Sequence, residues 1–222
     1  RLDDLHGVGE EAPELRTVAE GSLQAIVSDA PRHLRAKRRD LSAHHDVQRR
    51  LLSEQAVLPL RFGLIAPDDD AVRAALDEHA ESYADRLARL AGRVEFRLKA
   101  SEDEDTSVRR AVERSAEVRR LSEATRRGGG TYEERLRLGE LIAAEVRARQ
   151  DALAAEMIGA LRPYTVDETR GGAEGEDFLN VSFLVDRDRS REFGAAVEKL
   201  GERYAPGIEL RPRGPLPPYS FV

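Results

Sequence analysis

The sequence of 222 residues contains no cysteine, no tryptophan, one methionine and few aromatic residues. The absence of cysteine excludes a disulfide framework, a thiolate metal site and a cysteine nucleophile, and it is compatible with a reducing cytoplasm. No apolar run approaches the roughly 20 residues that a membrane-spanning helix needs, and no signal peptide is evident. We therefore expect no membrane partner.

Charged residues are abundant, but their signs are not segregated. They make up 35% of the chain against 40% apolar residues, and the net charge is −6. Arg and Lys alternate with Glu and Asp, whereas a nucleic-acid-binding protein usually gathers basic residues on one face. Only RAKRR at 35–39 approaches such a patch, so we expect no nucleic-acid partner. The apolar content and length suffice for one large domain or two small ones.

The first part of the chain, residues 1–92, predicts a small α+β domain. Two short strands are expected at 15–18 and 23–27, separated by a glycine-containing turn. A helix is predicted at 40–55 from the spacing of its apolar residues. The mostly apolar run at 57–65 is typical of a strand, with its proline at a start or edge position.

A longer helix is predicted from Asp68 to Gly92. Three consecutive aspartates at 68–70 begin it. Carboxylates at this position accept hydrogen bonds from free backbone N–H groups and complement the helix dipole. A calcium-binding EF-hand loop would need further ligands and a terminal Glu, which the sequence lacks. Helix capping is therefore favoured over a metal site.

The stretch 93–99 alternates between apolar and charged residues and predicts a strand. We expect Val94, Phe96 and Leu98 to face a core. The charged residues between and after them, Glu95, Arg97 and Lys99, are expected to face water. The charged row could form a partner surface, but the solvated face of a half-buried sheet is the favoured interpretation.

Residues 93–222 together predict a ferredoxin-like domain. The elements expected after the first strand are helices at 101–127 and 132–161, strands at 164–166 and 178–185, a helix at 189–204 and a strand at 208–211. This is the βαββαβ order of a ferredoxin-like sheet, with 101–130 as a helical insertion. The Pro-rich tail at 214–222 is expected not to be helical. The fold class is thus α+β with two domains, 1–92 and 93–222.

No combination of residues indicates catalysis. His44 and His45 are adjacent, so on a helix their rings point about 100° apart and do not converge on one metal ion. The chain has no Gly-x-Ser-x-Gly elbow, and its triple glycine at 128–130 does not follow a strand as a phosphate loop would. We expect no catalytic residue, cofactor or metal site.

Arg61 stands inside the apolar run, next to Phe62. If the run is a strand, Arg61 emerges on a polar face while its neighbours pack; alternatively, Arg61 is buried and paired with a carboxylate across the domain boundary. We take Arg61 and Phe62, with Pro217, Pro218 and Tyr219 of the tail, as a candidate partner or domain-junction surface.

Five motifs in one order resemble the gas vesicle GvpF/GvpL family. They are AIVSD at 25–29, VLPLRFG at 57–63, VEFRLK at 94–99, NVSFLV at 180–185 and GPLPPYSF at 214–221. Leu216 stands where the family more often has Trp. Members usually open with a Y-x-Y-x-V strand, and none precedes Leu2. Because the chain also begins at Arg1 in place of Met, we expect a fragment whose first sheet is one strand short.

The resemblance implies a cytoplasmic, shell-associated gas vesicle protein that is needed for vesicle formation and has no catalytic activity or cofactor. Its implied partners are the small hydrophobic major shell protein and other gas vesicle accessory proteins. We expect it to bind the shell subunit and limit its aggregation during nucleation. Edge strands, the tail and the charged helix at 101–127 are the candidate surfaces.

The alternative hypothesis is a small-molecule-binding or regulatory α+β domain. Ferredoxin-like sheets host many functions, so the fold class alone does not exclude it. A deep pocket with convergent polar groups would favour this alternative, and shallow grooves would count against it.

Overall fold

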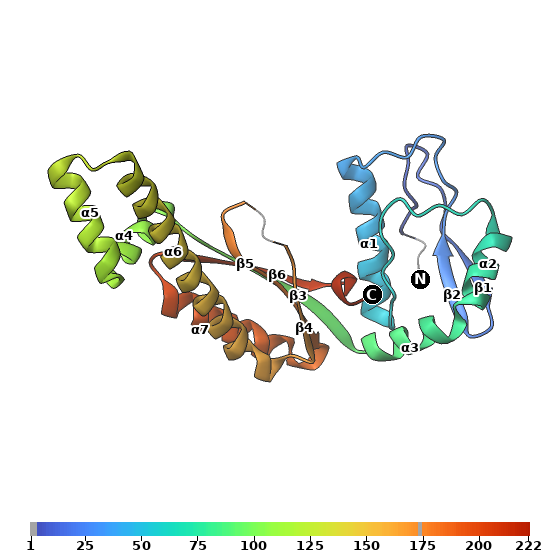
Figure 1. The fold of residues 1–222 in the computed structure, drawn as a ribbon. Helices are drawn as coiled ribbons and strands as arrows, with labels where there is room; N and C mark the ends of the chain where they lie inside the picture. Colours follow the sequence, from blue (N-terminus) through green and yellow to red (C-terminus); the bar gives the residue numbers. More distant parts are fainter. Residues whose placement is uncertain (1–3, 173–174) are drawn as a thin grey trace. The chain divides into compact units, whose positions relative to one another are not determined.

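The computed structural model describes residues 4–172 and 175–222. Contacts divide the chain into two compact units, an N-terminal unit of Arg1–Glu95 with Pro215–Val222 and a C-terminal unit of Phe96–Gly214. Figure 1 shows the elements of each unit. This division groups the end of the tail with the N-terminal unit, unlike the ranges 1–92 and 93–222, which remain a prediction.

The N-terminal unit combines a hairpin with three helices. Its elements are β1 (Arg16–Glu20), β2 (Leu23–Val27), α1 (Arg38–Glu54), α2 (Asp69–Glu78) and α3 (Ala80–Leu90). β1 and β2 are antiparallel, and Gly21 adopts φ 57° in the turn between Glu20 and Leu23. This left-handed backbone conformation favours glycine. The predicted strands and the predicted helix at 40–55 are confirmed, with small shifts at their ends.

The predicted strand at 57–65 is wrong. The structure forms a loop between α1 and α2, because Gly63 turns the backbone with φ 93° and Pro59 cannot donate to a ladder. Its apolar residues also do not share a buried face, since Leu64 is 72% and Ile65 56% exposed.

The predicted single helix at 68–92 is two helices, α2 and α3, separated at His79. This residue has φ −110° and ψ 16°, outside the helical range, and its ring contacts Tyr83 with centroids 5.4 Å apart. The predicted cap is confirmed, since Asp68 accepts a hydrogen bond of 2.8 Å from the backbone N–H of Ala71.

The C-terminal unit carries a four-stranded sheet. The strands are β3 (Arg93–Glu102), β4 (Asp167–Arg170), β5 (Asp177–Asp186) and β6 (Ile208–Leu216). The first and last of these strands along the chain, β3 and β6, extend into residues grouped with the N-terminal unit. The order of the four strands in the sheet is β4-β5-β3-β6, the order expected of a ferredoxin-like βαββαβ chain. The predicted α+β class is confirmed, although β4 begins later than the predicted strand at 164–166.

Helices complete the C-terminal unit. They are α4 (Glu104–Arg114), α5 (Ala116–Gly128), α6 (Tyr132–Leu161) and α7 (Ser190–Tyr204), with short 3₁₀ helices at Arg162–Tyr164 and Arg187–Arg189. The helix predicted at 101–127 is divided at Ser115, whose hydroxyl accepts from the backbone of Val118. The helix predicted at 132–161 is confirmed as α6, and a reciprocal capping box of Thr131 and Glu134 fixes its start.

The core of this unit forms between the sheet and its helices. Phe193 of α7 lies 4.9 Å from Phe96 of β3 and 5.5 Å from Phe183 of β5, measured between ring centroids. These three side chains are buried, together with Met157 and Leu161 of α6. The tilted ring arrangement is one that aromatic pairs prefer in cores.

Candidate partner surface

The end of the tail packs into the N-terminal unit. Pro217, Pro218 and Phe221 are buried, and a 3₁₀ turn spans Tyr219–Phe221, so the expectation of a wholly non-helical tail is wrong. The backbone N–H and the hydroxyl of Ser220 donate hydrogen bonds of 2.9 and 2.8 Å to the carboxylate of Glu95.

The prediction that Glu95 of β3 faces water is wrong. Its neighbours Val94 and Phe96 are buried as predicted, but Glu95 is itself only 1% exposed and does not face water. A buried carboxylate is tolerated when it accepts hydrogen bonds, and Ser220 supplies two of them from 125 residues along the chain. The local alternation could not reveal this partner.

Tyr219 connects the tail to α1. Burial raises the pKa of its hydroxyl above the ordinary value, and a hydrogen bond with Gln48 of α1 offsets part of this rise. Gln48 is itself buried, and its side-chain oxygen has no hydrogen-bond partner among the described residues.

The same face of α1 holds the loop at 57–65. The side-chain nitrogen of Gln48 donates to the carbonyl oxygen of Leu60 at 3.0 Å, and Nε2 of His44 lies 2.9 Å from that oxygen. The ring of Phe62 stands edge-on to His44, with centroids 5.7 Å apart. The tail and the loop therefore share α1 as a common support.

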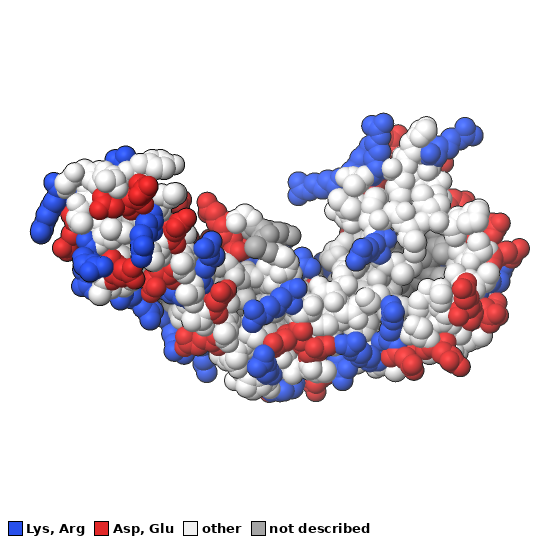
Figure 2. Space-filling model, viewed as in Figure 1, with Lys and Arg blue, Asp and Glu red and all other residues white. Residues whose placement is uncertain are grey.

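Large apolar side chains of α1 and of the loop are exposed. We define the apolar patch as Leu41 of α1 with Leu60, Leu64 and Ile65 of the loop, which are between 42% and 72% exposed. In Figure 2, the part of the N-terminal unit crossed by this loop is largely uncharged, with Lys and Arg side chains beside it. Exposed apolar groups that cluster in this way mark interaction surfaces more often than isolated ones do.

Two exposed cations accompany the patch. Arg61 follows Leu60 in the loop. Arg38 lies three residues before Leu41 in α1, so Arg38 and Leu41 are on the same side of that helix. Both are exposed, and among the described residues neither has an ion pair. Arg61 is exposed, as the first alternative expected, but it lies in a loop and not in a strand, and its neighbour Leu60 is 46% exposed and not packed.

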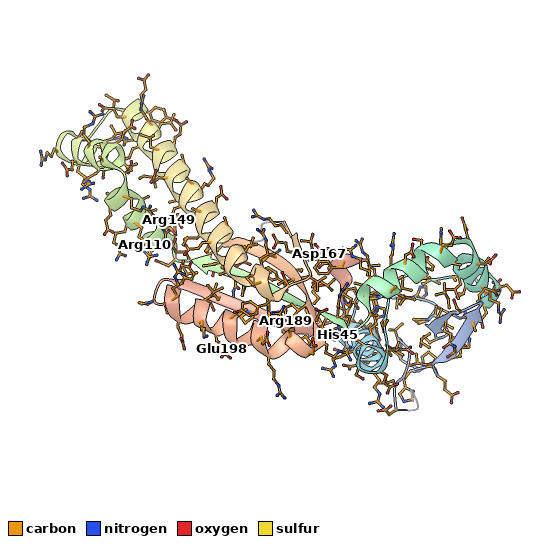
Figure 3. All side chains as sticks on the ribbon, turned by 90° about the horizontal axis from the view of Figure 1, so that it is seen from below. His45, Arg110, Arg149, Asp167, Arg189 and Glu198 are labelled. Carbon is orange, nitrogen blue, oxygen red and sulfur yellow. The ribbon has the colours of Figure 1, made fainter. Side chains whose placement is uncertain are left out.

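A buried ionic cluster lies in the C-terminal unit. The carboxylate of Glu102, fully buried, accepts hydrogen bonds from Ser107 (2.6 Å), Arg110 (2.8 Å) and both terminal nitrogens of Arg149. Figure 3 shows Arg110 and Arg149 near each other, on α4 and α6. Burial acts to raise the pKa of Glu102, but the bonds from Arg149 and Ser107 hold it below its ordinary value. The cluster fastens the helical insertion to the end of β3.

A second buried carboxylate joins three strands. Asp177 of β5 pairs with Lys99 of β3 at 3.5 Å and with Arg211 of β6. Lys99 is therefore not simply a solvated side chain, as its predicted position suggested. In both clusters the buried carboxylate is paired with two basic side chains.

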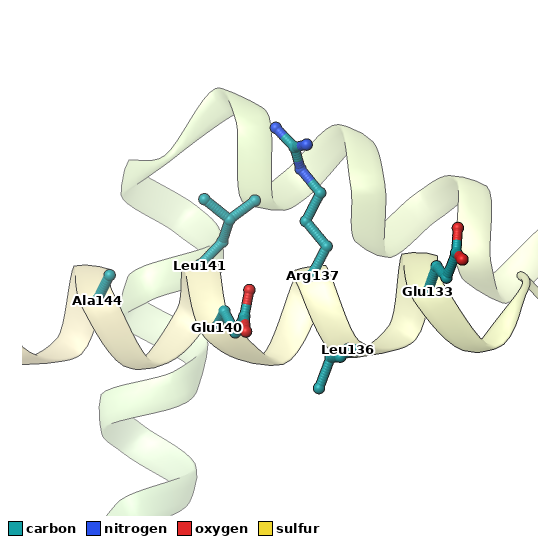
Figure 4. A pocket seen from close by; sticks show the side chains of 6 residues that line it. All are labelled: Glu133, Leu136, Arg137, Glu140, Leu141 and Ala144. Atoms are coloured by element: carbon teal, nitrogen blue, oxygen red, sulfur yellow. The ribbon is translucent and has the colours of Figure 1, made fainter.

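The described residues hold no group of three or more side chains suited to bind a metal ion. The aspartates at 68–70 are engaged otherwise, since Asp69 accepts two bonds from Arg16 and Asp70 pairs with Arg73. A groove along α6, drawn in Figure 4, is lined by six residues of that one helix and is open to the surface. Within the described chain, no helix is long and apolar enough to cross a membrane.

The family of the chain follows from comparison with known proteins. The family model described as "Gas vesicle synthesis protein GvpL/GvpF" matches residues 2–222. The chain belongs to this family. Gas vesicle protein F of Streptomyces sp. (strain CB03234) is 46% identical over 99% of this chain and 92% of its own length. Gas vesicle protein L of the same organism is 30% identical over 99% and 86%.

Solved structures of the family share the fold. Gas vesicle protein GvpF from Anabaena sp. PCC7120 matches with a TM-score of 0.87 and 19% identity, covering 99% of this chain and 92% of that one. GvpF from Microcystis aeruginosa matches with a TM-score of 0.82 and 21% identity, covering 98% and 91%. The match of the family model and the 46% identical relative confirm the family resemblance that the sequence motifs indicated.

The structure links some of the predicted surface residues and separates others. Phe62 and Tyr219 are joined through His44 and Gln48 of α1, whereas Pro217 and Pro218 are buried and offer no surface to a partner. Sequence reasoning missed the role of α1. The spacing of His44 and Gln48, four residues apart on one helix face, was the signal that could have indicated it.

Proposed function

We propose that this chain is a non-enzymatic, minor component of the gas vesicle, associated with its shell and required for vesicle formation. The observation that carries this proposal is the family match over residues 2–222, together with relatives named gas vesicle proteins F and L. In this role the chain binds the small major shell protein, cooperates with other accessory proteins, and limits aggregation of the shell subunit during nucleation.

The apolar patch supports a binding role. A hydrophobic shell subunit that has not yet assembled needs its apolar surface covered, and side chains such as Leu64 and Ile65 are available to cover it. The remaining surface is densely charged, which keeps such a complex in solution. We therefore propose Arg61 and Phe62, with the patch around them, as part of the partner surface.

The other candidate surfaces have weaker support. β4 is only four residues long and begins with Asp167 and Glu168, and β6 carries Pro212 and Pro215. Short strands, charges and prolines are the usual means by which proteins prevent strand addition at sheet edges. The open groove on α6 lacks the enclosed, convergent polar groups that a small-molecule site would need.

A complementation experiment tests the proposed function. A gas-vesicle-forming host deleted for its own homologue would receive the full-length gene or an empty vector, and vesicles would be counted by electron microscopy. Restored vesicles support the proposal, while their absence despite expression of folded protein contradicts it. Light scattering of shell subunit diluted from denaturant, with and without this chain, tests the effect on aggregation.

A further inference from the structure

We propose that the N-terminal unit contains a binding site for a short peptide, that the turn at 217–221 of the tail occupies this site, and that the site also accepts this segment from a second copy of the chain. The ligand is the sequence Pro-Pro-Tyr-Ser-Phe. The site is independent of the proposed function, because its ligand is a segment of this chain and not the shell subunit.

The turn at 217–221 is a compact segment that carries hydrogen bonds of its own. The backbone N–H of Tyr219 donates to the carbonyl oxygen of Pro217 at 2.8 Å. That of Phe221 donates to the carbonyl oxygen of Pro218 at 3.2 Å. The two prolines fix two φ angles and have no N–H group that needs a partner. Such a segment loses little conformational freedom when it binds, as preorganised ligands do.

The remaining backbone N–H of the turn, that of Ser220, is recognised by a carboxylate of the N-terminal unit. The N–H and the hydroxyl of Ser220 donate to the two oxygens of Glu95, at 2.9 and 2.8 Å. Glu95 is 1% exposed, so each donor that a ligand brings to it counts strongly. A ligand without the hydroxyl would leave this buried charge with one donor fewer. The serine is therefore the residue by which the site selects its ligand.

Apolar side chains supply the rest of the contact. The two prolines and Phe221 are buried, and the contacts of Pro215–Val222 group this segment with the N-terminal unit. Tyr219 is half-buried, and its hydroxyl forms a hydrogen bond with Gln48 of α1. Figure 1 shows the end of the tail next to this helix. Pockets for apolar side chains, with a few polar groups that fix orientation, are typical of sites that bind small ligands and peptides.

These contacts do not depend on the covalent link between the turn and its site. The chain leaves the C-terminal unit after Gly214, and Ser220 lies 125 residues from the carboxylate that it binds. The described residues 217–221 belong to no strand, so no ladder of backbone hydrogen bonds continues into the turn. The link instead raises the local concentration of the turn to the millimolar range or so, which favours the chain's own segment over another copy.

The test uses the full chain and a fluorescein-labelled peptide of residues 214–222. The chain variants Phe221→Ser and Ser220→Ala weaken the chain's own turn. The same two substitutions are made in the peptide, with Val222→Ser as the matched control, because Val222 is the adjacent residue and is 43% exposed. Binding is measured by fluorescence anisotropy, and circular dichroism checks that each chain variant is folded.

We expect the peptide to bind the Phe221→Ser chain at least about 10-fold more tightly than the wild type, in which the linked turn competes. With the Phe221→Ser chain, the Ser220→Ala peptide should bind about 10-fold more weakly than the wild-type peptide. The Phe221→Ser peptide should lose about 10-fold or more, and the Val222→Ser peptide should bind like the wild-type peptide. Equal binding of the wild-type and Ser220→Ala peptides would overturn the recognition by Glu95.

Hydrogen exchange of the wild-type chain makes the test independent of the variants. Excess unlabelled peptide should displace the turn and speed exchange at the amides of Ser220 and Phe221, while the amides of α6 in the other unit stay unchanged. If the Phe221→Ser chain does not fold, the Ser220→Ala chain and this exchange measurement decide in the same way. A peptide that binds no folded chain and leaves the exchange unchanged would show that the turn is a fixed part of the core, and would overturn the proposal.

Discussion

The substitution Arg149→Met should weaken the C-terminal unit because it leaves a buried carboxylate with too few partners. The side chain of Glu102 is fully buried, and the side chain of Arg149 is only 8% exposed. Arg149 donates two of the hydrogen bonds that the carboxylate of Glu102 accepts. Breaking a buried ion pair by removing one partner costs roughly 3–5 kcal/mol. Because Arg110 and Ser107 remain, we expect the low end, about 3 kcal/mol.

The matching change Glu102→Gln removes the buried negative charge and leaves Arg149 buried without its partner. We expect a similar loss for this single variant, but the double variant should lose less than the two single losses added together. A coupling of about 1–3 kcal/mol is typical of directly bonded residues. The assay is urea unfolding followed by circular dichroism, with hydrogen exchange of α4 and α6 to locate the effect. Strictly additive losses would refute the reasoning.

The same cluster predicts a dependence on pH. The pKa of Glu102 lies below its ordinary value of 4.5 in the folded chain. Its contribution to stability is therefore present above that ordinary value, and it is lost as the pH falls through the lower folded pKa. The wild type should lose stability over this acidic range more steeply than Glu102→Gln, which has no carboxyl to protonate. Parallel stability curves for the two proteins would contradict the assignment.

Three further predictions concern the tail and α6. Ser220→Ala removes one hydrogen bond to the buried carboxylate of Glu95 and should cost about 1–2 kcal/mol, with faster hydrogen exchange at the chain end. Thr131→Ala removes half of the capping box and should cost about 1 kcal/mol in urea unfolding, and a change within error would argue against the cap. Tyr219→Phe should remove an ultraviolet titration whose midpoint lies above the ordinary tyrosine pKa of 10.0. A midpoint at or below that value would contradict the burial of the hydroxyl.

The parts of the fold that local patterns govern could be predicted from the sequence. The helix at 132–161 has a long apolar stripe and a capping box, and the structure has α6 over the same residues. The βαββαβ order predicted the sheet order, because a ferredoxin-like chain arranges its strands in one way. Both features depend on residues close together in the chain or on general rules of connection.

The features that failed depend on residues far apart. The run at 57–65 was composed like a strand, but its backbone carbonyl at Leu60 bonds to Gln48 of α1 and its apolar side chains stay exposed. Glu95 alternated like a solvated residue, yet Ser220 binds its carboxylate in the interior. For the candidate surface, the motif at 57–63 indicated the region, but only the structure separates exposed Arg61 from buried Pro217 and Pro218.

Co-sedimentation with the shell subunit tests the central claim most directly. The purified chain would be mixed with freshly prepared major shell protein, and separately with intact vesicles, and the pelleted fraction would be measured against concentration. We predict saturable binding to the shell subunit that survives moderate salt and is weakened by Leu64→Ser. A folded chain that stays in the supernatant with both would contradict direct binding to the shell.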